Sequence, residues 1–194
     1  DKKIAGNNVY AIERDTDVAA TGYENVFCIE EDQHLSYAAY TNPVEFSAAT
    51  GYFNFPNSAK WLINNMYVTN VSGRDGLDGE VARKVLLMNL ANLVTTQEIK
   101  NKVATYGFDG SDITPQNIYA LKNVELGSAH RVNALEYVEQ LALWKYTKNM
   151  GSSISDAYRN NPNQFFDDSS LTGIEQRTLK YTYYALTALA DMKA

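Results

Sequence analysis

Cys28 is the single cysteine among the 194 residues, and its side chain is the one best suited to nucleophilic chemistry. It lies in the segment VFCIE (residues 26–30), whose β-branched and aromatic residues predict a strand. Because a thiolate attacks carbonyl carbon well, Cys28 could act in acyl transfer. A lone cysteine can also pack as a small buried hydrophobic residue, so this residue alone leaves both interpretations open.

Gln140 is the second candidate, in the predicted helical segment EYVEQLALWKYT (residues 136–147). Residues three and four apart are neighbours on a helix, so Tyr137 and Trp144 share a face with Gln140. This spacing places a carboxamide beside an apolar wall. The alternative is that Gln140 is a polar residue at the edge of an amphipathic helix.

Two other classes of protein compete with a role in acyl transfer. A cysteine-dependent hydrolase or transferase needs an imidazole within hydrogen-bond reach of the sulfur. The chain has two histidines, His34 and His130, and the sequence neither forbids nor specifies a contact of either one with Cys28. The other alternative is a non-covalent surface binding module in which the thiol of Cys28 is buried and free.

Cys28 and Gln140, in their order and surroundings, give the chain a resemblance to a known family. That family has an aromatic residue before its cysteine, here Phe27, and later a Thr-Gln-x-Ala-aliphatic-Trp motif, here QLALW (residues 140–144). A weaker third match is LINNMY (residues 62–67), against an aliphatic-Asn-Gly-Tyr segment. On these motifs the chain resembles, over most of its length, the thioester domains of Gram-positive surface adhesins and pilus-tip proteins.

Two positions depart from the family pattern. Glu139 stands where the family commonly has threonine, and residues 65–66 (NM) stand where glycine is expected. Neither change removes an atom of the bond that the family forms. Residues 96–97 keep the Thr-Gln pair, but no Ala or Trp follows at the required offsets, so Gln140 is the preferred glutamine.

The resemblance implies an internal thioester between Cys28 Sγ and Gln140 Cδ, formed with loss of ammonia. A ligand amine, such as a lysine side chain, would attack the Gln140 carbonyl carbon and expel the Cys28 thiolate. The product is an amide on Gln140. Such a domain reacts once and needs no cofactor or metal, so it is not an enzyme in the steady-state sense.

The implied chemistry needs two kinds of neighbour. Aromatic side chains must keep water off the thioester, and the candidates are Phe27, Tyr137 and Trp144. A general base must deprotonate the attacking amine, because a lysine-like amine has a pKa of about 10.4 and is charged at neutral pH. The candidates for that base are Glu139, Glu136, His130, Glu30 and Glu31.

The resemblance also implies a partner and a location. The partner is a host or environmental protein that presents a primary amine. We expect a monomeric domain within a larger, extracellular, cell-wall-anchored protein whose signal and anchor lie outside this chain. The formal charge of −6 argues against nucleic acid. No apolar run reaches the roughly 18 residues that span a bilayer, so we expect no membrane insertion.

The strands and helices that must position these residues are predicted to form an α+β fold in one domain, residues 1–194. Residues 1–57 are predicted to be β-rich, with strand-like runs at 9–12, 25–29, 35–40 and 44–47. Residues 58–194 are predicted to be mainly helical. We expect the β-rich part to pack against the larger helical part, with the thioester bridging the two.

Capping residues predict the helix boundaries. Ser58 and Ser128 are expected to cap helices over about 58–66 and 129–150. The pair Thr114-Pro115 is expected to open a helix that reaches about residue 126. A long helix is expected over 80–106, with TTQE (residues 95–98) as an alternative break. The last helix is expected from about Thr172 to Lys193.

Overall fold

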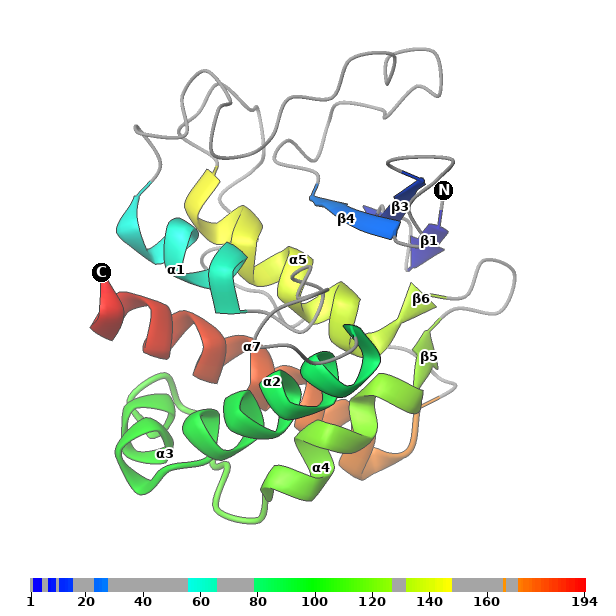
Figure 1. Ribbon diagram of the computed structural model, residues 1–194. Coiled ribbons are helices and arrows are strands. Elements are labelled where there is room, and N and C mark those ends of the chain that lie inside the picture. The colour runs from blue at the N-terminus through cyan, green and yellow to red at the C-terminus, as the bar shows by residue number, and fades with distance from the viewer. Residues whose placement is uncertain are drawn as a thin grey trace.

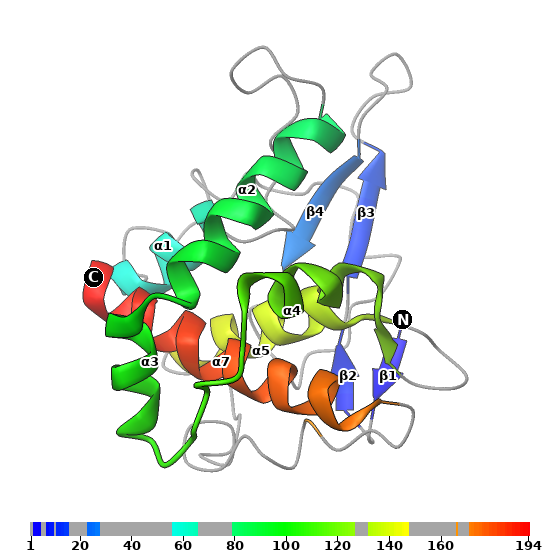
Figure 2. The same ribbon diagram turned by 90° about the horizontal axis from the view of Figure 1, so that it is seen from below.

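The computed structural model of the chain describes residues 2–4, 7–9, 11–15, 23–27, 56–65, 79–126, 132–147, 166 and 171–194. Over these residues the protein is mostly helical, with little strand (Figure 1). Helices α5 (Ala134–Thr147) and α7 (Gly173–Lys193) pack against each other and form the centre. The helices around them, seen from below in Figure 2, are α1 (Asn57–Asn65), α2 (Gly79–Val94), α3 (Gln97–Ala104) and α4 (Pro115–Ala120).

Where the structure describes the first 27 residues, it has four short strands in two antiparallel pairs. Strand β1 (Lys2–Ile4) pairs with β2 (Asn7–Val9), and β3 (Ala11–Asp15) pairs with β4 (Tyr23–Phe27). These strands fall inside the segment predicted to be β-rich. The strands expected at 35–40 and 44–47 lie outside the described residues, so the predicted α+β class stays a prediction.

Helix α7 organises the core, because it contacts each of the other α-helices described. Thr172 caps it: the Thr172 hydroxyl accepts the backbone N–H of Glu175 at 3.3 Å, and Glu175 Oε2 accepts the backbone N–H of Thr172 at 2.7 Å. The expected bounds of this helix are confirmed. Its buried side chains include Leu179, Tyr183, Leu186 and Ala190, the four that its apolar period predicts.

The long helix expected over 80–106 is two helices, and the break lies at the alternative position. Helix α2 ends at Val94, and Thr96 caps α3 by accepting the backbone N–H of Ile99 at 3.4 Å. The break lets both helices bury apolar residues against the same core, since Val94 and Ile99 are each at most 1% exposed. After α3, Gly107 adopts a φ of 81°, a conformation open to glycine.

Three expected helix boundaries are wrong. The helix after Thr114 ends at Ala120 and is followed by a 3-10 turn, η5 (Leu121–Asn123), and by strand β5 (Glu125–Leu126). Helix α5 begins at Ala134 rather than at residue 129, because the preceding strand β6 (Val132–Asn133) pairs with β5. Strand pairing within this hairpin overrides the helical pattern on both sides of it. Ser58 lies inside α1 rather than before it.

Candidate functional site

Helix α5, which carries Gln140, is buried along almost its whole length. Ala134, Leu135 and every side chain from residue 137 to residue 144 are at most 4% exposed. The helix packs against α1, α7, η5 and β6, and Figure 1 shows it between α7 and β4. A side chain of α5 therefore meets protein on most sides.

Asn133 fixes the start of α5. Its Oδ1 accepts the backbone N–H of Leu135 at 2.9 Å and that of Glu136 at 3.3 Å. These bonds satisfy two of the N–H groups that the first turn of a helix leaves without a partner in the helix. Asn133 Nδ2 donates to the carbonyl oxygen of Lys122, which joins the cap to η5. The first turn of α5 is thus held from two directions.

Tyr146 determines which side of α5 faces α7. Its hydroxyl lies 2.8 Å from the carbonyl oxygen of Thr187 and 2.7 Å from Asp191 Oδ1, both in α7. Burial, and then the Asp191 carboxylate, raise the pKa of Tyr146, so the hydroxyl keeps its proton and acts as the donor. Because an α-helix turns about 100° per residue, Gln140 points about 120° away from the side that carries Tyr146. Gln140 is therefore on a different side of α5 from the one that carries Tyr146.

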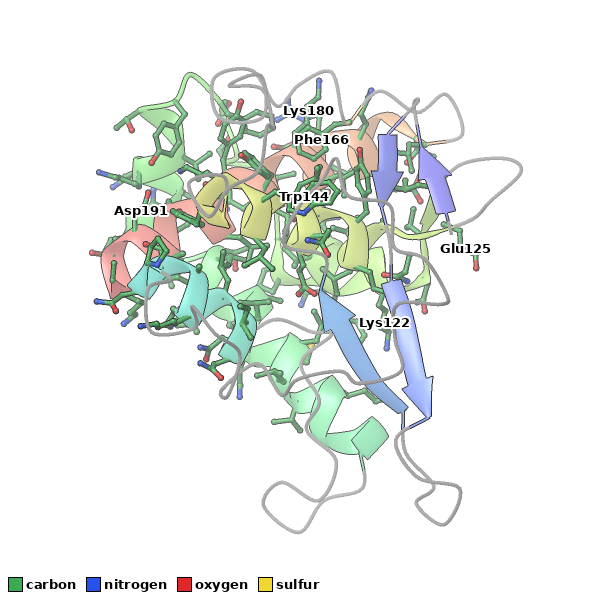
Figure 3. The ribbon with its side chains drawn as sticks, turned by 90° about the horizontal axis from the view of Figure 1, so that it is seen from above. Lys122, Glu125, Trp144, Phe166, Lys180 and Asp191 are labelled. Atoms are coloured by element: carbon green, nitrogen blue, oxygen red, sulfur yellow. The ribbon has the colours of Figure 1, made fainter. Side chains whose placement is uncertain are left out.

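Gln140 lies between two buried aromatic residues on that side. Tyr137 is three residues before it and Trp144 four residues after it, and both are 0% exposed, while Gln140 is 4% exposed. Figure 3 shows Trp144 in the interior of the molecule, on α5. The three residues thus share one buried side of α5, and a shielding role for Tyr137 and Trp144 stays a prediction.

Strand β4 ends at Phe27, one residue before Cys28. In Figure 3 the C-terminal end of β4 points toward α5, whereas in Figure 1 the strand runs alongside that helix. The backbone of Phe27 pairs with that of Ala11. Cys28 and the side chain of Phe27 lie outside the described residues, so the Cys28–Gln140 bond and a shielding role for Phe27 stay predictions.

The candidate bases occupy different places. Glu136 is partly buried and lies one turn before Gln140, on the same side of α5. Glu139 is 0% exposed and lies two turns before Tyr146, on the side that faces α7. The remaining candidates, His130, Glu30 and Glu31, lie outside the described residues.

The rival glutamine, Gln97, lies at the surface. It is the first residue of α3, it is exposed, and its Nε2 donates to Asn101 Oδ1 at 2.8 Å. A thioester at that position would be open to hydrolysis. The burial of Gln140 makes it the better place for a bond that water destroys.

Sequence reasoning missed two residues that hold this site in place. Asn133 could have been found, because Asn133 and Glu136 have the spacing of a capping box. Asp191 could not, since its hydrogen bond to Tyr146 joins residues 45 apart in the chain. Asp191 also accepts a hydrogen bond from Ser58 Oγ at 3.4 Å and lies 3.5 Å from Lys145 Nζ, so it joins α1, α5 and α7.

Within the described ranges, no group of three or more His, Cys, Asp or Glu residues is placed to hold a metal ion. None of the helices described there is long and apolar enough to cross a membrane. Comparison of the chain with protein-family models, with curated proteins and with solved structures finds no match.

Proposed function

We propose that this protein attaches covalently to a ligand amine through an internal thioester between Cys28 and Gln140. The observation that carries the proposal is the placement of Gln140. Gln140 is 4% exposed and is flanked along the helix by two fully buried aromatic residues. It lies about 120° around α5 from Tyr146, which contacts α7, and strand β4 ends one residue before Cys28 and points toward α5 in Figure 3.

The reaction sequence follows from the atoms involved. The Cys28 thiolate attacks Gln140 Cδ and ammonia leaves, which forms the thioester. A ligand amine then attacks the same carbon, the C–S bond breaks, and Cys28 returns to a thiol while Gln140 is left in an amide with the ligand. Each molecule reacts once, so the activity is a single acyl transfer rather than steady-state catalysis.

Burial supports this chemistry because the competing reaction is hydrolysis. Water attacking Gln140 Cδ would convert the glutamine into glutamate and end the function. Tyr137 and Trp144, both 0% exposed, limit the access of water to that carbon. The same burial means that the ligand amine must reach the carbon through a restricted opening.

The partner and the location are part of the proposal. The ligand is a host or environmental protein that offers a primary amine, and the chain is a domain of an extracellular surface adhesin of a Gram-positive bacterium. Sequence motifs at Phe27-Cys28 and at residues 140–144 support this assignment. We propose α+β architecture with the thioester joining the strand-containing and helical parts.

The test is an intact-protein mass spectrum of freshly prepared protein, with and without methylamine. We expect a mass about 17 Da below the sequence value, one ammonia, and a single methylamine adduct that maps to Gln140. Cys28→Ala and Gln140→Ala should each have the mass calculated from their own sequences, with no adduct. Gln97→Ala is the matched control and should behave as the wild type.

An unmodified mass with a Cys28 thiol that is alkylated at once in denaturant would refute the thioester. In that case the non-covalent binding module becomes the better explanation of the chain. Repeated turnover of an amide or ester substrate without a covalent adduct would point instead to the cysteine-dependent hydrolase.

A further inference from the structure

We infer that Glu136 is the general base of the acyl transfer at Gln140, an assignment that rests on the function proposed above. Of the five acidic and imidazole candidates, Glu136 and Glu139 are described by the structure. Both belong to α5, and the helix places them on different sides.

The helix geometry brings Glu136 close to the reacting carbon. Glu136 and Gln140 are four residues apart, so their Cβ atoms are roughly 5–6 Å apart on one side of α5. The Cα–Cβ bonds of a helix tilt toward its N-terminus, so the side chain of Gln140 leans over the turn that contains Glu136 and Tyr137. A carboxylate at position 136 therefore lies beside the carboxamide rather than behind it.

The exposure of Glu136 suits a residue that exchanges protons. Its side chain is partly buried, whereas Gln140 is 4% exposed. Glu136 is thus more exposed to solvent than the residue whose carbon reacts.

The backbone of Glu136 is fixed and its charge is favoured. Asn133 Oδ1 accepts the backbone N–H of Glu136 at 3.3 Å, which holds this turn in place. Glu136 belongs to the first turn of α5, where the helix dipole favours a negative charge. The residue is therefore suited to being a carboxylate, the form that accepts a proton.

Glu139 lacks these features. It is 0% exposed, about 100° from Gln140 around the helix axis, and on the side of α5 that Tyr146 holds against α7. Although it is adjacent to Gln140 in sequence, neighbouring residues of a helix do not face each other. We assign to Glu139 a place in the α5–α7 interface and no proton transfer.

The step balances with a net release of one proton to solvent. The Glu136 carboxylate takes a proton from the ligand ammonium as it arrives, and the neutral amine attacks Gln140 Cδ. As the C–S bond breaks, the amide nitrogen loses its second proton to solvent, and Glu136 delivers its own to the Cys28 thiolate. The products are the amide, the Cys28 thiol and a regenerated Glu136 carboxylate.

Two amines separate loss of a base from loss of structure. Methylamine is almost entirely protonated at pH 7, as a lysine side chain is, whereas hydroxylamine is already neutral and a good nucleophile. In Glu136→Gln protein that shows the ammonia loss, we expect methylamine to add about 100-fold more slowly than in wild type. Hydroxylamine should add at the wild-type rate within about twofold. A disturbed pocket would slow both amines alike.

Glu139→Gln is the matched control, since it makes the same change on the same helix. It should leave the ratio of methylamine to hydroxylamine rates unchanged, even if it alters stability, which thermal unfolding measures separately. Glu136→Asp should recover part of the methylamine rate, because it restores a carboxylate.

Equal methylamine rates in wild type and Glu136→Gln, both with the thioester formed, would overturn the assignment and leave the thioester standing. Failure of the wild type itself to lose ammonia would refute the proposed function, and Glu136 with it. If Glu136→Gln never loses ammonia, Glu136→Asp takes its place in the comparison, and a slower methylamine rate at an unchanged hydroxylamine rate supports the assignment.

Discussion

The hydroxyl of Tyr181, in the middle of α7, donates a 2.6 Å hydrogen bond to the carbonyl oxygen of Val94, the last residue of α2. The two residues are 87 apart in the chain, and the bond is buried. The last carbonyl groups of a helix have no partner within that helix, so Tyr181 supplies one for α2. This bond fixes where α2 stops and α3 turns away.

Tyr181→Phe should therefore destabilise the protein by about 1–3 kcal/mol, because it leaves the buried Val94 carbonyl without its partner. Chemical denaturation would measure the change in the free energy of unfolding. Tyr184→Phe removes the same atom from a partly exposed ring of α7 and should cost less than about 0.5 kcal/mol. Similar costs for the two variants would contradict a special role for the Tyr181 hydroxyl.

The same residue predicts part of the alkaline limit of stability. Burial raises the pKa of Tyr181 from 10.0 to about 12. The folded protein then holds this proton more tightly than the unfolded chain, so the stabilisation is complete below pH 10 and declines as the pH rises through 12. Between those pH values, the free energy of unfolding should fall more steeply with rising pH for wild type than for Tyr181→Phe. Parallel curves would contradict this.

Gly110 should be intolerant of a side chain. A Cβ at this position would overlap the ring of Tyr181, which is 0% exposed and cannot move aside. We expect Gly110→Ala to cost about 1–3 kcal/mol in unfolding experiments, the usual price of overpacking. Gly173→Ala is the matched control, since no atom lies within 4 Å of its added Cβ and α7 begins there. It should be neutral or slightly stabilising.

Thr178 offers a stabilising change. Its Oγ1 is buried and, within the part of the chain that the structure describes, has no hydrogen-bond partner. Thr178→Val replaces that hydroxyl with a methyl group of similar shape, so we expect stability to stay the same or rise by up to about 1 kcal/mol. Thr182→Val is the comparison. Thr182 Oγ1 donates a hydrogen bond to the Thr178 carbonyl oxygen at 2.7 Å, so removing it should lower the stability of the protein. Thermal unfolding would measure the melting temperature of each variant, which should be unchanged or higher for Thr178→Val and lower for Thr182→Val.

Trp144 should govern the lifetime of the proposed thioester. Trp144→Phe keeps an aromatic ring but opens space beside Gln140, which should speed hydrolysis of the bond by severalfold. Mass spectrometry would follow the conversion of Gln140 to glutamate over days. Phe166→Leu is the control: it also shrinks a buried aromatic residue, but one that packs against Tyr183 with ring centroids 5.6 Å apart. An unchanged lifetime in Trp144→Phe would remove Trp144 from the shield.

A feature of the structure could be predicted from the sequence where neighbouring residues within the same element determine it. The bounds of α7 are predictable, because Thr172 and Glu175 form a capping box and the apolar residues repeat with a helical period. The side shared by Tyr137, Gln140 and Trp144 is predictable for the same reason. The start of α5 is not, since it depends on the pairing of β5 with β6.

The orientation of that side is also beyond local patterns. A helix wheel places Glu136 and Glu139 on different sides of α5 but does not say which side meets α7. That choice is made by the contact of Tyr146 with Thr187 and Asp191, residues more than 40 positions away. Choosing between the two glutamates as base therefore requires the fold.

The burial of α5 has a mechanical consequence. A ligand joined to Gln140 would pull on a helix packed against α1 and α7 and tied to both through Asp191. Tension would spread over the whole helical core instead of peeling away a surface loop. Separating the ligand would then require either rupture of a covalent bond or extraction of a buried helix. In single-molecule pulling, the unfolding force should fall in Asp191→Ala, which lacks the hydrogen bonds that join α1, α5 and α7.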